Sequence, residues 1–247
     1  QLEDPKKTKK IVKRGVTEII TPGLATVDGV VNPKSNNFLA SLHFAGTVGL
    51  SLLDISTGEF LIAEGDIEYT AKLLDNFSPN EVLITKENKK HFVKSYSDSF
   101  NLFFLDEWVF NLDYANDLLK KQFETSSLKG FGIDDLNNGI ISSSAIMHYL
   151  NETQHERLNH ITTIKRIPKE GHVWLDRFTI RNLELFRPNS VEGKCLIDVI
   201  DQTLSPMGGR LLKRWVALPS CDKEVIISRH NIVEFLISDE KTNELIH

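Results

Sequence analysis

Four carboxylates have positions along the chain that could serve phosphodiester hydrolysis with two metal ions. Asp54 lies near the end of a predicted strand, within Leu-Leu-Asp-Ile at 52–55, and Glu59, Asp134 and Asp135 stand beside predicted turns. A two-metal nuclease keeps one ligand at such a strand end and needs two or three more carboxylates around the same ions. Because carboxylates beside turns commonly bond the turn backbone, the sequence favours a hairpin-stabilising role for Asp54. A metal-dependent nuclease that uses Asp54 is the alternative.

No other pattern predicts a complete active site in the chain. The Gly-Lys pair at 193–194 has Pro188 where a phosphate loop needs its first glycine, and the Gly-Phe-Gly at 130–132 lacks the third glycine of a dinucleotide loop. The eight histidines have no metal-binding spacing. His148 lies among apolar positions of a predicted helix, which favours a packing role. We therefore expect no cofactor within these residues.

Composition limits the class of protein. The chain is 40% hydrophobic and 26% charged, which is typical of a globular protein with room for two modest cores. Its two cysteines, Cys195 and Cys221, have no paired spacing, and no apolar stretch approaches the roughly 20 residues that span a bilayer. These features predict a cytoplasmic protein. Net charge of -5 argues against general nucleic-acid binding, and the basic run at 6–14 is typical of a solvated segment, with a phosphate contact as the alternative.

Hydrophobic patterning predicts the elements that must position these residues. The strands are expected at 38–44, 48–55, 59–63, 81–85 and 101–105. The helices are expected at 66–77, 113–123 and 139–152. Strands first, then strands alternating with helices, indicate a mixed α/β sandwich.

The last third of the chain has a different pattern. Short β-like pieces at 164–167 and 172–175 precede helices that begin near Pro206 and Asp222, types that suit a first helical turn and an N-cap. Near the start, a β-rich segment at 14–20 has no predicted partner strand. Because the sequence begins without methionine and its last helical pattern has no stop signal, we expect an internal piece of a larger protein.

Several stretches, taken in order, resemble the MutS family of DNA mismatch-recognition proteins. Val-Thr-Glu-Ile-Ile-Thr-Pro-Gly at 16–23 is similar to the exit strand of the family's mismatch-binding domain. The segment at 53–60, Leu-Asp-Ile-Ser-Thr-Gly-Glu-Phe, resembles the hairpin of the family's connector domain. The segment at 149–154 resembles the closing helix of that domain. The segments at 181–185 and 203–215 resemble the opening of the family's core, or lever, domain. The more specific of them is 203–215, Thr-Leu-Ser-Pro-Met-Gly-Gly-Arg-Leu-Leu-Lys-Arg-Trp.

The resemblance implies domain boundaries and a role. Residues 1–22 would end the mismatch-binding domain and 23–37 would be a linker. Residues 38–160 would form the connector, an α/β domain with an RNase H-like fold, and 161–247 the mostly α-helical first part of a truncated core domain. The implied role is non-catalytic transmission between the mismatch-binding and ATPase domains. The family's phosphate loop and its Phe-x-Glu element have no match in this sequence, so no site residue carries over.

The resemblance also implies partners of the full-length protein. These are mismatched duplex DNA, a second copy of the chain, ATP with Mg²⁺, and a MutL-type protein that meets the connector. We expect the MutL-type contact on the predicted helix 113–123, whose outward residues are polar and mixed in charge: Asn116, Asp117, Lys120 and Lys121. A solvated helix face accounts for the same residues without a partner.

Overall fold

The computed structural model describes residues 19–24, 33–96, 100–153, 158–190 and 192–239. They divide into two compact units. Among the described residues, the first unit comprises 19–24, 36–74 and 78–167, and the second comprises 33–35, 75–77 and 168–239. The basic run at 6–14 and most of the expected strand at 14–20 lie outside the described residues, and Ile19 and Ile20 are not in a strand.

The first unit is built on one mixed sheet with the strand order β5-β4-β1-β2-β3-β6. Its strands are β1 (Phe38–Phe44), β2 (Val48–Asp54), β3 (Glu59–Gly65), β4 (Glu81–Thr85), β5 (Leu102–Leu105) and β6 (Lys165–Arg166). The first three pair antiparallel as a meander, and β4 and β5 then follow parallel to β1. This order confirms the expected RNase H-like α/β fold.

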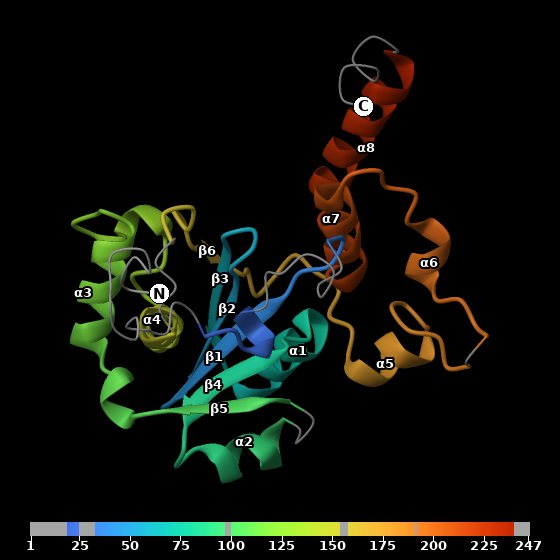
Figure 1. The fold of residues 1–247 in the computed structure, drawn as a ribbon. Coiled ribbons are helices and arrows are strands. Elements are labelled where there is room, and N and C mark those ends of the chain that lie inside the picture. Colours follow the sequence, from blue (N-terminus) through green and yellow to red (C-terminus); the bar gives the residue numbers. More distant parts are fainter. Residues whose placement is uncertain (1–18, 25–32, 97–99, 154–157, 191, 240–247) are drawn as a thin grey trace, which may run out of the picture. The chain divides into compact units, whose positions relative to one another are not determined.

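Helices cover both faces of this sheet. They are α1 (Ile67–Phe77), α2 (Lys89–Ser95), α3 (Leu112–Gln122) and α4 (Asn137–Glu152), with short 3-10 turns at Pro22–Leu24, Glu107–Val109 and Leu128–Phe131. Figure 1 shows α3 and α4 on one side of the sheet and α1 on the other. α4 packs directly on β1 and β2, and its residues from Gly139 to Leu150 are all buried. The expected helix at 139–152 is therefore covered on all sides rather than on one face.

The first turn of α4 is fixed by residues from the sheet. Leu136 at its N-cap offers no side-chain hydrogen bond, but Glu64 Oε2 on β3 accepts from the backbone nitrogens of Asn138 (2.8 Å) and Gly139 (3.2 Å). A negative charge at a helix N-terminus is favourable. Gly49 on β2 permits this close approach, because a Cβ there would lie 2.0 Å from Asn138 O.

The strand β6 also belongs to the first unit. Lys165 and Arg166 pair parallel with Leu61 and Ile62 of β3. Tyr69 donates to Ile167 O at 3.2 Å, which fixes the end of this segment. The sequence pattern predicts the β-like piece at 164–167. It does not identify the partner strand, which lies about a hundred residues earlier in the chain.

The second unit is mostly helical. Its helices are α5 (Arg177–Asn182), α6 (Leu196–Ile200), α7 (Pro206–Ala217) and α8 (Lys223–Ser238). Pro206 lies in the first turn of α7 and Asp222 caps α8 through Glu224 N and Val225 N, as the sequence predicts, and Ser205 caps α7. The β-like piece at 172–175 contributes only an isolated bridge between His172 and Ser220 rather than a strand.

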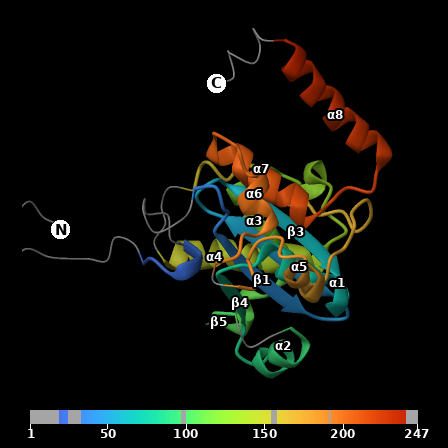
Figure 2. The same cartoon turned by 90° about the vertical axis from the view of Figure 1, so that its right-hand side faces the viewer.

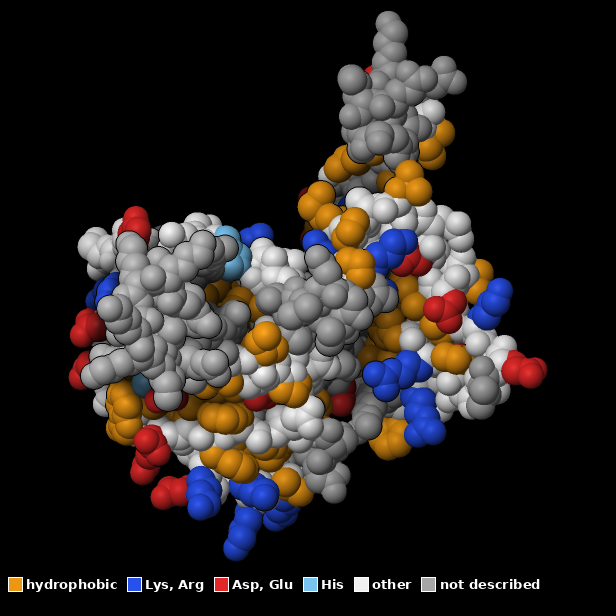
Figure 3. All heavy atoms as spheres, in the orientation of Figure 1, with side chains coloured by type: hydrophobic (Ala, Val, Ile, Leu, Met, Phe, Trp, Pro, Cys, Tyr) orange, Lys and Arg blue, Asp and Glu red, His pale blue; other side chains and the backbone are white. Residues whose placement is uncertain are grey.

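The helix α8 is the most exposed of these elements. Figure 2 shows it as a single uninterrupted helix, and none of its residues is buried. Hydrophobic side chains at its surface are visible in Figure 3. Within the described residues, no helix combines the length and the apolar character needed to cross a membrane.

Candidate functional site

Asp54 is fully buried at the end of β2 and bonds the turn beside it. Its Oδ1 accepts from the backbone nitrogen and the hydroxyl of Ser56, at 2.9 and 2.6 Å. Its Oδ2 accepts from Asn36 Nδ2 at 2.8 Å and from Asn37 N at 3.3 Å. Four donors therefore occupy the acceptor positions of this carboxylate. The geometry supports the hairpin-stabilising role.

The four candidate carboxylates do not converge on one point. Glu59 faces Asp54 across the hairpin and shares the Asn36 amide with it, at 3.2 Å. Asp135 instead receives Arg166 Nη1 on both of its oxygens, each at 2.9 Å, and Asp134 is exposed to solvent. Among the described residues there is no group of three or more His, Cys, Asp or Glu side chains placed to hold a metal ion.

A buried carboxylate that sequence reasoning missed is Glu81, at the start of β4. Its Oε2 accepts from Thr21 Oγ1 (2.5 Å) and Gly23 N (3.1 Å), and its Oε1 accepts from Tyr149 OH (3.1 Å). Gly23 has no room for a side chain, since a Cβ would lie 2.9 Å from Glu81 Cβ. Glu81 therefore anchors the Thr-Pro-Gly segment on the first unit.

The residues around the Glu81 anchor form further hydrogen bonds. Burial, with the Glu81 carboxylate adding to it, raises the pKa of Tyr149 to about 12, so the phenol stays protonated and donates. Asn37 Nδ2 donates to Pro22 O at 3.1 Å, and Asn80 Nδ2 donates to Asn37 Oδ1. The available signal in the sequence was one acidic residue at the head of a buried strand.

The four proposed partner residues lie on α3 but differ in exposure. Asp117 and Lys121 are exposed, whereas Asn116 and Lys120 are half-buried. Asn116 Nδ2 donates back to Leu112 O at 3.0 Å, within the helix. Only the exposed pair is presented fully to solvent.

An aromatic cluster beside α3 was also missed by sequence reasoning. Trp108 is 56% exposed and packs edge-on against Tyr114 and His148. Tyr114 OH lies 2.8 Å from His148 Nδ1, and His148 Nε2 lies 3.3 Å from Glu152. Burial, with Glu152 adding to it, raises the pKa of Tyr114. His148 thus has the packing role that the sequence favours, in support of an exposed tryptophan.

Comparison with known proteins covers both units. A family model of MutS domain II matches residues 37–162, and a family model of MutS domain III matches residues 178–247. A DNA mismatch repair protein MutS from Christiangramia forsetii is 56% identical over 240 residues, which cover 97% of this chain and 28% of the relative. The MutS of Parabacteroides distasonis is 52% identical over 247 residues, which cover 100% of this chain and 28% of the relative.

The chain spans about 28% of the length of these relatives. Both matched models and the order in which they occur agree with the resemblance of the hairpin at 53–60 and of the segment at 203–215. The chain therefore belongs to the MutS family, with domain II sequence at 37–162 followed by domain III sequence at 178–247.

Proposed function

We propose that these domains transmit conformational changes between the mismatch-binding and ATPase parts of a whole DNA mismatch repair protein, without catalysing a reaction. The observation that supports this most directly is the use of carboxylates in the first unit as hydrogen-bond acceptors. Asp54, Glu64 and Glu81 each bond backbone or side-chain donors that fix a turn, a helix start or a chain segment. Such bonds stiffen the domain and occupy these three carboxylates as hydrogen-bond acceptors.

The cofactors and remaining partners belong to other parts of the whole protein in this proposal. The sequence has no phosphate loop, so the residues present do not fit ATP or its Mg²⁺. Mismatched DNA and the second copy of a homodimer would likewise meet the whole protein, in the cytoplasm. We expect the 247-residue chain to show no ATP turnover and no preference for heteroduplex DNA. A clear heteroduplex preference in a gel-shift assay would count against the proposal.

The same proposal includes a MutL-type partner that contacts the outward face of α3. The face carries Asp117 and Lys121 exposed, with Asn116 and Lys120 partly so, and Trp108 stands beside it. Exposed tryptophan next to charged residues is typical of protein interfaces, where tryptophan often contributes most of the binding energy.

Binding of the chain to a MutL-type protein from a close relative tests this contact. Trp108→Ala and Lys121→Glu should each weaken binding, by about tenfold for a contact at the centre of an interface. Lys94→Glu on α2 makes the same charge change on an exposed residue elsewhere in the first unit and should leave affinity unchanged. Equal affinities for all variants would show that α3 is simply a solvated helix.

The nuclease alternative has its own test. Cleavage of DNA or RNA that requires Mg²⁺ or Mn²⁺ and disappears in Asp54→Asn would establish it. We expect no cleavage, because the Asp54 oxygens already accept four hydrogen bonds.

A further inference from the structure

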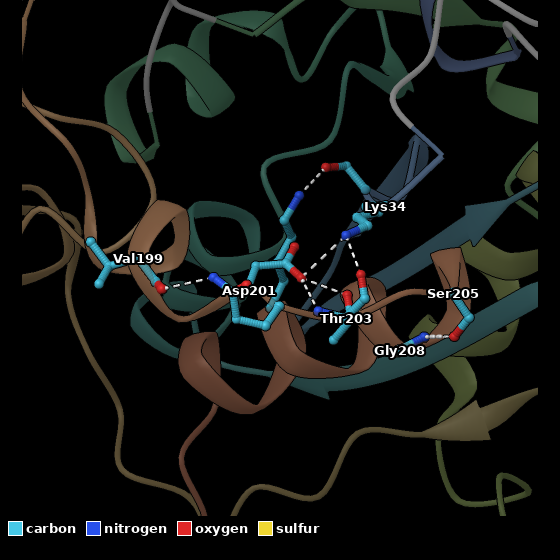
Figure 4. Close-up of polar contacts among 9 residues, drawn as sticks. Lys34, Val199, Asp201, Thr203, Ser205 and Gly208 are labelled. Atoms are coloured by element: carbon cyan, nitrogen blue, oxygen red, sulfur yellow. Dashed lines mark hydrogen bonds and ion pairs between the residues drawn. The ribbon is translucent and has the colours of Figure 1, made fainter. Parts of the chain in front are cut away.

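Residues Pro33–Ser35 belong to the second unit, although the chain enters β1 only three residues later. Figure 4 shows Lys34 directed at the loop that precedes α7. Lys34 Nζ donates to Thr203 O at 2.5 Å and lies 3.5 Å from Asp201 Oδ1. These partners are 169 and 167 residues away in the sequence.

The helix α7 holds the same segment on both sides of Lys34. Arg210 Nη1 donates to Pro33 O at 2.7 Å, and Lys213 Nζ donates to Ser35 Oγ at 2.5 Å. Residues three apart lie on one face of a helix, so one face of α7 receives the segment.

Gly209 lies on this face, where the Lys34 side chain leaves no room for a Cβ. A Cβ at Gly209 would lie 2.9 Å from Lys34 Cβ and Cγ and 3.0 Å from its Cδ. Gly in a helix interior lowers stability relative to Ala. The glycine at 209 is explained by the Lys34 methylenes, which pass over α7 too closely for a larger residue.

Asp201 presents a carboxylate that is already organised for Lys34. Its Oδ1 accepts from Thr203 N at 3.1 Å and from Thr203 Oγ1 at 2.5 Å. These bonds, with the nearby Lys34 charge, hold the pKa of Asp201 below its usual value. The loop therefore offers a fixed negative charge and a carbonyl oxygen to one lysine.

The segment differs from the anchor at the other end of the expected linker. There Leu24 is fully buried and Gly23 is buried against Glu81. Pro33 is exposed and Lys34 and Ser35 are half-buried. The Lys34 and Asp201 side chains are 33% and 14% exposed, so water and salt reach the ion pair.

We propose that residues 33–35 form a releasable strap on the second unit, which leaves α7 and the 201–203 loop while both units stay folded. A partly exposed ion pair is weakened by salt, and none of residues 33–35 is buried. Asn36, the next residue, is held by Asp54 in the first unit. The inference does not depend on the proposed partner contact.

Trypsin cleavage after Lys34 in the full chain measures release, because the protease reaches this lysine only when its side chain leaves Asp201 and Thr203. When opening is fast, cleavage reports the population of the open state. Asp201→Asn should speed cleavage after Lys34 by about fivefold. Raising NaCl from about 0.05 to about 0.5 M should also speed it, since the Debye length falls well below 10 Å. A small chromogenic substrate corrects for the effect of salt on trypsin, and mass spectrometry identifies the cut.

Gly209→Ala separates release from unfolding. The added methyl displaces Lys34 while it favours the helix, so cleavage after Lys34 should rise and the thermal unfolding temperature should not fall. Gly130→Ala is the control, because no atom of the described residues lies within 4 Å of its added Cβ and it belongs to the first unit rather than to the 201–203 loop. Cleavage that is equal in the two glycine variants, or that rises only together with a lower unfolding temperature, would overturn the strap.

Discussion

The helices α4 and α8 have the same length, 16 residues, and opposite surroundings. Every residue of α4 from Gly139 to Leu150 is buried, including three consecutive serines, whereas α8 has no buried residue. Yet α8 carries large apolar side chains that are 39–75% exposed: Val225, Ile227, Ile232, Val233, Phe235 and Ile237. Apolar composition therefore does not predict which helix is buried.

The serines of α4 show how a polar helix can be buried. Ser51 Oγ on β2 lies 2.8 Å from Ser142 Oγ and 2.6 Å from Ser143 Oγ, and these three hydroxyls share Gly139 O as an acceptor. Because each of these hydroxyls has a partner, burial of the helix costs little. The first unit thus has a closed core, whereas the second unit exposes apolar side chains on α8.

The largest expected effect comes from breaking the contact between α4 and the sheet. Gly49→Ala would place a methyl 2.0 Å from Asn138 O, so β2 and α4 must separate. We expect a loss of about 3 kcal/mol or more in the free energy of unfolding, measured by denaturant. Gly46→Ala has no atom within 4 Å of its added Cβ and should change stability by less than about 0.5 kcal/mol. Equal stabilities would contradict the close packing.

A matched pair of isoleucines compares the two helices directly. Ile146 on α4 is fully buried and Ile232 on α8 is 58% exposed. Ile146→Ala should cost about 2–4 kcal/mol, because it removes buried methylenes and leaves a cavity. Ile232→Ala should cost less than about 0.5 kcal/mol in the same denaturation experiment. A similar loss in both variants would show that α8 is covered in solution.

High pH should weaken the first unit selectively. All four tyrosines of the chain lie in it, and burial raises the pKa of Tyr69, Tyr96 and Tyr149 to about 12. A raised pKa contributes stability that is complete below the ordinary value of 10.0 and is lost as the pH rises through 12. Phenolate absorbance together with hydrogen exchange should therefore report opening of the sheet between these pH values. Opening of α7 and α8 first would contradict this order.

The smallest effect on stability is expected at the surface of α8. The exposed apolar residues Ile232 and Phe235 favour self-association, since soluble monomers rarely expose large apolar patches. The double variant Ile232→Ser, Phe235→Ser should shift sedimentation towards monomer while changing the unfolding free energy little. Wild-type chain that sediments as a monomer at every concentration would remove the basis for this prediction.

Local elements were predictable from the sequence with small errors. The strands Phe38–Phe44 and Glu81–Thr85 have the expected ends, and the helices differ by one or two residues. Asp222 caps its helix through donors two and three residues away, as predicted. These interactions depend on side chains that are near each other in the sequence, so spacing alone identifies them.

Contacts between distant segments were not predictable. The Glu64 cap on α4 and the Glu81 anchor join residues 58 to 75 positions apart, and β6 pairs with a strand about a hundred residues earlier in the chain. A single acidic residue in a strand looks the same whether it faces water or receives three hydrogen bonds. Sequence spacing carries no information on which one occurs.

The sequence by itself determined the family resemblance, the α/β fold of the first unit and the helical second unit, because these follow from ordered motifs and hydrophobic periodicity. Only the tertiary structure decided that α4 is buried while α8 is exposed, that Asp54 is saturated with donors, and that Lys34 is held by Asp201. Burial and pairing depend on which surfaces meet after folding, and that is a property of the whole chain rather than of any local segment.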